Sequence, residues 1–441
     1  MEKANLSLHT EIKKAFGMFF TPEHIVDFMV MLIETKRLKK GGVILEPACG
    51  LAQFLSGIRR NLPWLYKKAT LFGVEINEKL VDYLKKSELA KKINFLQADY
   101  LLWESPKLFD LIIGNPPYGI PSISSHYPIK VPPQVKEKYK KEFQTWHGKY
   151  NVYGAFIEKS IRLLKEGGQL IFIVPASFMV LDEFKKLRIL MATQGKTQII
   201  YMGTQIFKPE ADICTVILNF IKTRNENSLL TLSEYKNMKI YLIKKLENWQ
   251  GEIITFDTPY TRKMKEICEY NVGDIYEIRI SPRTPEIKSN PLIIKCETPP
   301  SHDFLPILNG RNLKQDRIIY KNLTGFWVRK KNVVNIKTFF TIPHIVVGLG
   351  FRGKGKVAAA LEKKCYPWMG DVYHLIRKKT FFINRFSLTD EEVVKFLNSE
   401  CVAKYIKEIY REIIYHLNIT QIKSIPLPSN KEKWEAVRKL L

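Results

Sequence analysis

An alternation of short apolar runs with longer amphipathic stretches, over roughly the first 220 residues, most constrains the fold of this chain. Short β-branched runs bounded by turn residues and separated by helical periodicity are typical of a doubly wound α/β domain. The strands are expected at residues 43–45, 71–76, 93–96, 108–113, 169–174, 198–202 and 214–221. The last two read as a hairpin-like pair at one edge. We therefore predict a Rossmann-like, mostly parallel seven-stranded sheet with an antiparallel edge strand.

A second domain is expected after this sheet. The chain has 441 residues, more than one hydrophobic core usually supports, and it becomes polar between Lys222 and about Asn248. With 45% hydrophobic residues a packed core can form throughout. The pattern predicts an α/β domain over residues 1–250 and a mixed α+β domain over residues 251–441.

The charge balance indicates a polyanionic partner. Lys and Arg number 70 against 44 Asp and Glu, which gives a formal net charge of +26. A cationic surface of this size attracts phosphate backbones, although it could also serve solubility alone. Residues 309–356 are especially basic, and we expect their aromatic residues to contact bases; the alternative is a solvated face over an aromatic core. These aromatic residues are Tyr320, Phe326, Trp327, Phe339, Phe340 and Phe351.

The remaining composition favours a reduced, membrane-free environment. The six cysteines form no CxxC pair and have no histidine at zinc-ligand spacing, so we expect free thiols and no metal site. Residues 1–14 are polar and mixed in charge, unlike a secretory leader. The sequence therefore predicts a cytoplasmic protein that does not associate with membranes.

Three acidic residues stand at consecutive strand ends of the predicted sheet. Glu46 ends the first strand and precedes a small-residue turn, Glu75 ends the second, and Asp99 ends the third. Ligands of open α/β sheets bind at this edge, where such acids can accept from ribose hydroxyls and an adenine amino group. The turn lacks a GxGxxG pattern and a Walker-type lysine, which disfavours NAD and ATP. The three acids suit a nucleoside that carries an amino-acid-like cationic group.

The sharpest motif is Asn115-Pro116-Pro117-Tyr118, directly after the fourth strand. An exocyclic amine of adenine or cytosine is a poor nucleophile because its lone pair is delocalised into the ring. If the Asn115 side-chain oxygen and the Pro116 carbonyl accept its two N–H groups, the nitrogen becomes tetrahedral and its lone pair becomes available. Pro116 fixes the backbone, and Tyr118 offers an aromatic face to the base. A rigid turn is the alternative reading.

These residues resemble the S-adenosylmethionine-dependent DNA adenine-N6 methyltransferases of restriction–modification systems. The segments follow the order of the gamma group of that family: cofactor segment, catalytic segment, then target-recognition domain. More narrowly, the chain resembles the TaqI type. The resemblance spans nearly the whole chain. It is carried, besides the NPPY motif, by residues 20–23 (FTPE), 148–156 (GKYNVYGAF), 309–314 (NGRNLK), 365–368 (CYPW), Tyr410-Arg411 and His416-Leu417. The chain departs from the family at Ala52, where a second glycine is usual.

The resemblance implies a role for each matching residue. Thr21, Glu46 and Ala48 lie by the methionine part of S-adenosyl-L-methionine, Glu75 holds the ribose and Asp99 the adenine. Ile76, Pro117 and Phe156 pack on the adenine ring, and we also assign Cys49 and Tyr100 to the cofactor site. Asn115, Pro116 and Tyr118 form the catalytic loop, while Tyr118 and Phe207 sandwich a flipped-out adenine. In the second domain, Arg311 and Lys314 are expected to bind DNA.

The resemblance further implies a monomer that methylates adenine in duplex DNA, within 5′-TCGA-3′, and a cognate restriction endonuclease. The residues leave two alternative functions open. The NPPY motif also occurs in RNA and protein-glutamine methyltransferases, and Asp274 with Glu286 and Lys288 loosely resembles a metal-dependent nuclease pattern within a DNA-binding subunit.

Overall fold

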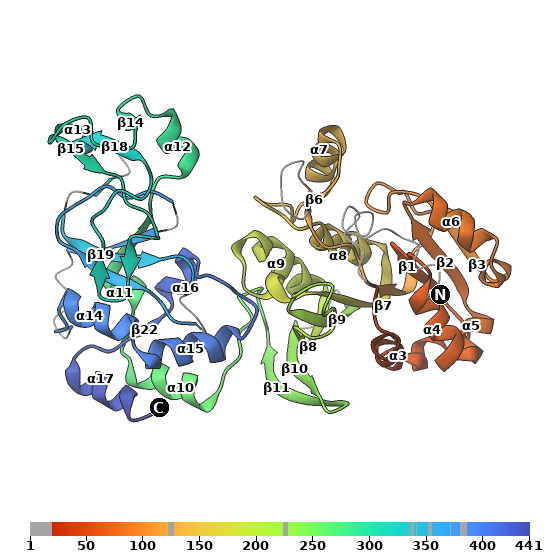
Figure 1. The fold of residues 1–441 in the computed structure, drawn as a ribbon. Helices are drawn as coiled ribbons and strands as arrows, with labels where there is room; N and C mark the ends of the chain where they lie inside the picture. The colour runs from red at the N-terminus through yellow and green to blue at the C-terminus, as the bar shows by residue number, and fades with distance from the viewer. Residues whose placement is uncertain are drawn as a thin grey trace. The chain divides into compact units, whose positions relative to one another are not determined.

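A computed structural model describes residues 20–121, 128–223, 228–334, 336, 339–340, 342–351, 355–370, 372–379 and 386–441. The contacts between residues divide the chain into two compact units, one ending at Thr255 and the other beginning at Phe256 (Figure 1). Residues 1–14, for which we expect no leader, lie outside the described part.

A nine-stranded sheet forms the centre of the first unit, in the order β11-β10-β8-β9-β7-β4-β1-β2-β3. Strands β3, β2, β1, β4 and β7 run parallel to one another, β8 and β10 share their direction, and β9 and β11 run opposite. The strands are β1 Val43–Pro47, β2 Thr70–Glu75, β3 Ile93–Gln97, β4 Phe109–Gly114, β7 Leu164–Pro175, β8 Gly195–Gly203, β9 Thr215–Lys222, β10 Leu229–Lys236 and β11 Lys239–Glu247. The predicted class, a mostly parallel sheet with an antiparallel edge strand, is confirmed.

The sheet differs from the prediction in having nine strands rather than seven. β10 and β11 lie in the stretch that we expected to be a polar boundary. In β10, Leu230 and Leu232 are buried, whereas β11 is mostly exposed although it contains Ile240, Tyr241 and Leu242. The added strands extend the sheet beyond β8 and leave β9 in its interior, between β7 and β8.

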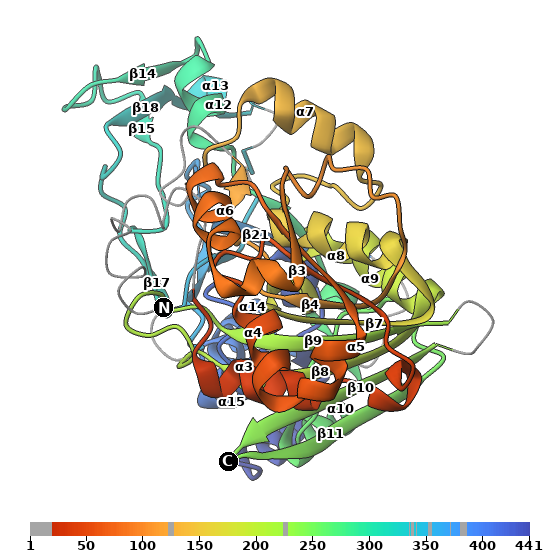
Figure 2. The ribbon, with the colours of Figure 1, turned by 90° about the vertical axis from the view of Figure 1, so that its right-hand side faces the viewer.

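Helices cover both faces of this sheet. α3 and α4 pack against each other on one side, and α8 and α9 lie together on the other (Figure 2). The close approach of α3 and α4 depends on Gly57, where an added Cβ would lie 2.6 Å from Val26 Cγ1. The helices are α3 Glu23–Met31, α4 Gln53–Asn61, α5 Pro63–Lys68, α6 Glu78–Lys85, α7 Pro133–Glu142, α8 Val152–Leu163 and α9 Lys185–Gln194. A short parallel pair, β5 Ile120–Pro121 and β6 Pro128–Ile129, precedes α7.

The second unit is a mixed α+β assembly, as predicted. Its antiparallel four-stranded sheet has the order β13-β21-β19-β20, and a three-stranded sheet has the order β14-β18-β15. The strands are β12 Tyr270–Asn271, β13 Tyr276–Ile280, β14 Ile293–Lys295, β15 Phe304–Pro306, β16 Leu313–Lys314, β17 Arg317–Ile318, β18 Phe326–Arg329, β19 His344–Gly348, β20 Ala359–Glu362, β21 Val372–Arg377 and β22 Pro426–Leu427. The helices are α10 Pro259–Ile267, α11 Val272–Ile275, α12 Thr284–Ser289, α13 Lys330–Val333, α14 Asp390–Leu397, α15 Glu400–Tyr410, α16 Ile419–Lys423 and α17 Lys431–Arg438. Among the described residues, no helix is long and apolar enough to cross a membrane.

Candidate active site

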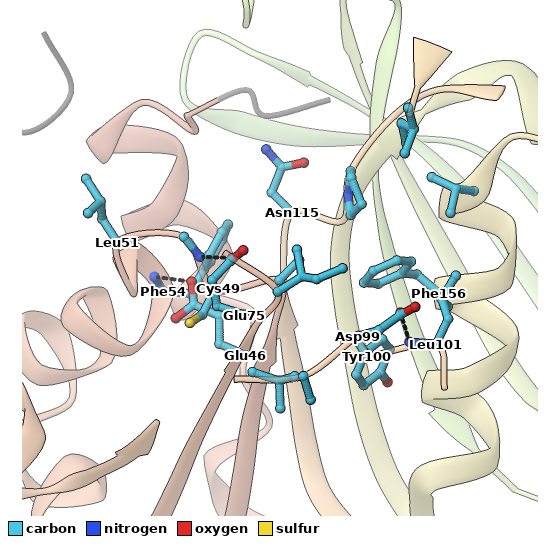
Figure 3. Close-up of a pocket in the computed structure, with 18 of the residues that line it drawn as sticks. Glu46, Cys49, Leu51, Phe54, Glu75, Asp99, Tyr100, Leu101, Asn115 and Phe156 are labelled. Carbon is cyan, nitrogen blue, oxygen red and sulfur yellow. Dashed lines mark hydrogen bonds between the residues drawn. The ribbon is translucent and has the colours of Figure 1, made fainter. Parts of the chain in front are cut away.

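A cavity opens at the carboxyl ends of β1, β2, β3 and β4, with an empty volume of about 1050 Å³ that includes its open mouth (Figure 3). The predicted cofactor residues, all but Thr21, line it together with Asn115. They are Glu46, Ala48, Cys49, Glu75, Ile76, Asp99, Tyr100, Pro117 and Phe156. The structure therefore brings together residues that are more than 100 positions apart, because parallel strands end at one edge of the sheet.

The turn after β1 bends sharply through three left-handed residues. Ala48, Gly50 and Ala52 have φ values of 49°, 54° and 56°. The Cys49 amide donates to the Val74 carbonyl at 2.9 Å, which ties the turn to β2. Ala52, which stands where the family usually has a glycine, therefore keeps the left-handed conformation of the turn. Glycine would adopt this conformation with less strain.

Glu46 lies beneath this turn and faces the first turn of α4. Its two carboxylate oxygens accept from the amides of Phe54 at 3.2 Å and Leu55 at 2.9 Å, which have no partner within the helix. Burial raises the pKa of Glu46 to about 8, although both amide bonds lower it. A buried acid held in this way favours a cationic ligand, which would stabilise its charged form.

Glu75 connects the ends of β1 and β2. One oxygen accepts from the Gly50 amide and the other from the Asn77 amide, both at 2.9 Å. The side chain is only 6% exposed, and burial raises its pKa. Because each carboxylate oxygen has two lone pairs, both retain capacity to accept from a diol.

An apolar slot lies beside Asp99. Ile76, which is 50% exposed, lines the cavity together with the buried Phe156 of α8, and the ring centroid of Phe156 lies 5.0 Å from that of Tyr100. Asp99 accepts from the Leu101 amide at 3.0 Å and from the Tyr139 hydroxyl at 2.6 Å. Sequence reasoning missed Tyr139, which is the single aromatic residue in the lysine-rich α7.

The NPPY loop leaves β4 directly into this cavity. Asn115 Nδ2 donates to the hydroxyl of the buried Thr21 at 3.2 Å, which fixes the direction of the amide. Thr21 therefore contacts the catalytic loop rather than the cavity wall. Pro117 lines the cavity, while Pro116 is not among the lining residues.

Tyr118 and Phe207 lie together, although they are 89 positions apart in the chain. Their ring centroids are 6.0 Å apart at an interplanar angle of 74°, an edge-to-face contact rather than two parallel plates. The Tyr118 hydroxyl donates to the Ile173 carbonyl at 2.8 Å, and burial raises its pKa well above the ordinary value. Tyr118 is therefore a neutral, anchored ring.

In the second unit, Arg311 and Lys314 are exposed as expected of DNA contacts. They flank Asn312, which is buried and donates to the carbonyls of Ile319 and Lys321 at 2.7 Å, so the turn is rigid. The Arg311 guanidinium donates to the Leu323 carbonyl.

The aromatic residues near this turn correct part of the prediction. Phe326, Trp327 and Phe339 are buried, and Phe326 and Phe339 belong to an apolar cluster with Ile307 and Val328. Phe326 and Trp327 are neighbours in β18, whose first three residues are all buried and whose last residue, Arg329, is exposed. The alternative reading, an aromatic core under a basic face, therefore holds for these three residues.

The residues of the nuclease-like pattern cap helices. Asp274 accepts from the Asn271 amide at 2.7 Å, and Glu286 from the Arg283 amide at 2.8 Å. Over the described ranges, no three His, Cys, Asp or Glu side chains gather as a metal site would need.

Comparisons with known proteins match both units. Residues 50–207 match the family of the Eco57I restriction-modification methylase, and residues 305–427 match the TaqI-like C-terminal specificity domain. A type II methyltransferase of Thermus thermophilus is 39% identical over 416 residues, which cover 94% of this chain and 91% of that protein. The chain belongs to the TaqI-type methyltransferases of restriction–modification systems.

Other matches are partial or structural. The modification methylase CviBIII of Paramecium bursaria Chlorella virus NC1A is 30% identical over 189 residues, 42% of this chain and 45% of that protein. The type IIL restriction-modification enzyme MmeI, solved in complex with DNA, superposes with a TM-score of 0.55 at 11% identity and covers 98% of this chain and 71% of that one. This likeness concerns the fold alone.

A TaqI-type enzyme methylates DNA within a restriction–modification system and uses S-adenosylmethionine. The cavity fits that cofactor: buried acids stand at the ends of β1 and β2, Asp99 follows β3, and an apolar slot lies beside it.

Proposed function

We propose that this enzyme transfers a methyl group to N6 of an adenine in duplex DNA. The observation that carries the proposal is the NPPY loop at the end of β4, with Asn115 and Pro117 lining the cavity. Asn115 Oδ1 and the Pro116 carbonyl would accept the two N6–H groups and make the nitrogen lone pair available. S-adenosylmethionine supplies the electrophilic methyl group when bound. The nitrogen then loses a proton to water, because a methylated anilinium-like nitrogen is acidic.

The proposed cofactor roles follow the chemistry of each side chain. Glu46 would receive the cationic amino-acid part near Ala48 and Cys49, and Glu75 would accept from the ribose hydroxyls. Thr21, which does not line the cavity, would act on this part through its bond to Asn115. Asp99 would accept from the adenine amino group. The adenine ring would lie between Ile76, Pro117 and Phe156, with Tyr100 supporting Phe156 from below; the half-exposed Ile76 supports this arrangement.

Base flipping is proposed because N6 of a stacked adenine cannot reach a buried loop, and unstacking costs a few kcal/mol. Tyr118 would stack on the extruded base. Phe207 now contacts Tyr118 edge-on, so it would have to rotate before it could cover the other face of the base.

The second unit is proposed to recognise the site, with a functional boundary near residue 250 and with Arg311 and Lys314 as DNA contacts. We propose TCGA as the site, a monomer as the active form and a cognate endonuclease as its counterpart. The match of residues 305–427 to a specificity domain supports the proposal that the second unit recognises the DNA site.

Transfer of labelled methyl to short duplexes tests the proposal. The set should hold TCGA, its single-base variants, TCGA already methylated at N6, and the matching RNA. Label in TCGA alone, recovered as N6-methyladenine after digestion, is expected. Label in another duplex would remove the TCGA assignment, N4-methylcytosine would remove the adenine assignment, and label only in RNA or protein would remove the DNA substrate.

A further inference from the structure

One wall of the cofactor cavity does not come from the strand ends. Ile129, Lys130, Val131 and Tyr139 all line the cavity, and they belong to the segment that follows the catalytic loop. This segment comprises β6 and α7.

α7 rests on the unit through a single buried side chain. Of its ten residues, PQVKEKYKKE, Tyr139 is the buried one, with 4% exposure, while Lys138, Lys140 and Lys141 face solvent. The ring of Tyr139 lies 6.1 Å from that of Trp146. The contacts of Tyr139 hold α7 together with those of Glu142, whose side chain and carbonyl accept from Arg162 of α8 at 3.0 Å.

Tyr139 contacts the cavity acid Asp99. Its hydroxyl donates to Asp99 Oδ2 at 2.6 Å, while Oδ1 accepts from the Leu101 amide at 3.0 Å. Burial raises the pKa of Tyr139, and the neighbouring Asp99 raises it further, so the phenol keeps its proton and donates. The two bonds hold both carboxylate oxygens and leave each with a lone pair for a ligand.

We propose that Tyr139 is a positioning residue for the nucleoside: it locks the Asp99 carboxylate in the orientation that accepts an exocyclic amine, and so selects a 6-amino over a 6-oxo purine. The proposal rests on the proposed role of Asp99.

Calorimetric titration of the full chain with S-adenosylhomocysteine and with its 6-oxo counterpart, S-inosylhomocysteine, measures both affinity and selection. Tyr139→Phe should weaken S-adenosylhomocysteine about tenfold, the effect of one hydrogen bond to a charged group, and should reduce the preference over the 6-oxo ligand. Tyr150→Phe is the matched control, because it removes a buried hydroxyl bound to Thr145 at 2.6 Å and should change both affinities less than about twofold. Unchanged affinity and selection in Tyr139→Phe would overturn the proposal.

A double-mutant cycle with Asp99→Asn separates positioning from a general structural effect. If Tyr139 acts through Asp99, Tyr139→Phe should have almost no further effect in the Asp99→Asn background. Equal losses in both backgrounds would make Tyr139 structural and overturn the proposal. Unchanged binding in Asp99→Asn alone would instead refute the proposed role of Asp99. This outcome differs from the one that refutes the role of Tyr139 alone.

Discussion

At the scale of single residues, Asn115 joins the segment before the sheet to the catalytic loop. Its Nδ2 donates to the Thr21 hydroxyl, and this bond orients the amide so that the oxygen Oδ1 points away from Thr21. Asn115→Ala removes the proposed acceptor for N6–H, an interaction that strengthens as the nitrogen becomes tetrahedral. We expect methyl transfer to slow by about 10²–10³.

Cofactor affinity, measured by titration with S-adenosylhomocysteine, should change about threefold or less in Asn115→Ala, since truncation removes one wall contact. Thr21→Val is the matched variant: it keeps Asn115 but removes the 3.2 Å bond, and should slow transfer less. A single-turnover rate near wild type for Asn115→Ala would refute the assigned role.

The residues of the site could be predicted to different extents. Glu46 and Glu75 lie at the ends of strands and Asn115 directly follows one, so the shared sheet edge made their convergence predictable from the sequence. Tyr139 lies in a helix whose pattern is polar and basic, and nothing in that pattern tells which side chain turns inward toward Asp99. The prediction for Phe326 and Trp327 was wrong because aromatic residues that lie near basic ones in the sequence can also belong to a buried strand such as β18, in which only Arg329 is exposed.

At the scale of elements, the start of α4 stores strain. Ala52 is buried and left-handed, with φ 56° and ψ 43°, which costs about 1–2 kcal/mol for a residue with a Cβ. Ala52→Gly relieves this cost but adds freedom to the unfolded chain, so the net gain should be about 0.5–1 kcal/mol in urea unfolding. Ala155→Gly, within α8, should destabilise by about 1 kcal/mol. A loss of stability in Ala52→Gly would show that its methyl packs favourably.

The two histidines of β19 and β21 predict a pH dependence of the second unit. Both are buried, His344 Nε2 lies 2.7 Å from His374 Nδ1, and His374 Nε2 lies 2.8 Å from Ser281 Oγ. His344 Nδ1 faces the Ile342 carbonyl, which can only accept, so the protons run in one direction: His374 donates to His344 and Ser281 donates to His374. This direction holds when both rings are neutral, and the contact between His344 Nε2 and His374 Nδ1 excludes the state in which both rings are protonated, since two N–H groups would then face each other.

Burial lowers the pKa of both rings, and for His374 the neighbouring His344 lowers it further. The unfolded state therefore binds more protons below about pH 6.5, so stability is full above that pH and is lost as the pH falls toward the folded pKa values. Urea unfolding of the second-unit transition at pH 7 and pH 5 should show this loss, and His374→Gln should reduce it. An equal loss in that variant would assign the effect to other groups.

The strand pair β10 and β11 marks the limit of prediction for elements. The seven strands found from the sequence have apolar runs or sharp turn boundaries. β10 and β11 join an edge, where β11 needs no apolar face and is mostly exposed. β10 pairs with β8 over residues 229–234, but the polar residues 233–239 (SEYKNMK), at the end of β10 and the start of β11, predict a linker here from the sequence alone.

At the scale of the whole molecule, the net charge of +26 predicts that DNA binding depends steeply on salt. Each phosphate neutralised by Lys or Arg releases counterions, and the slope of log affinity against log salt is about −0.9 per contact. S-adenosylhomocysteine would lie among the buried acids and apolar walls of the cavity, so its affinity should change little over the same range.

Filter binding of a TCGA duplex from about 50 to 200 mM salt should therefore weaken by several orders of magnitude for six to ten phosphate contacts. Arg311→Ala and Lys314→Ala should each reduce the slope by about 1 if these exposed residues contact phosphates. Lys85→Ala, an exposed lysine of α6, is the matched control and should leave the slope unchanged. If either variant instead weakens the preference for TCGA while the slope of log affinity against log salt stays constant, the substituted side chain contacts a base edge rather than a phosphate. If both leave slope and preference as in the wild type, the rigid turn held by Asn312 is not part of the DNA contact.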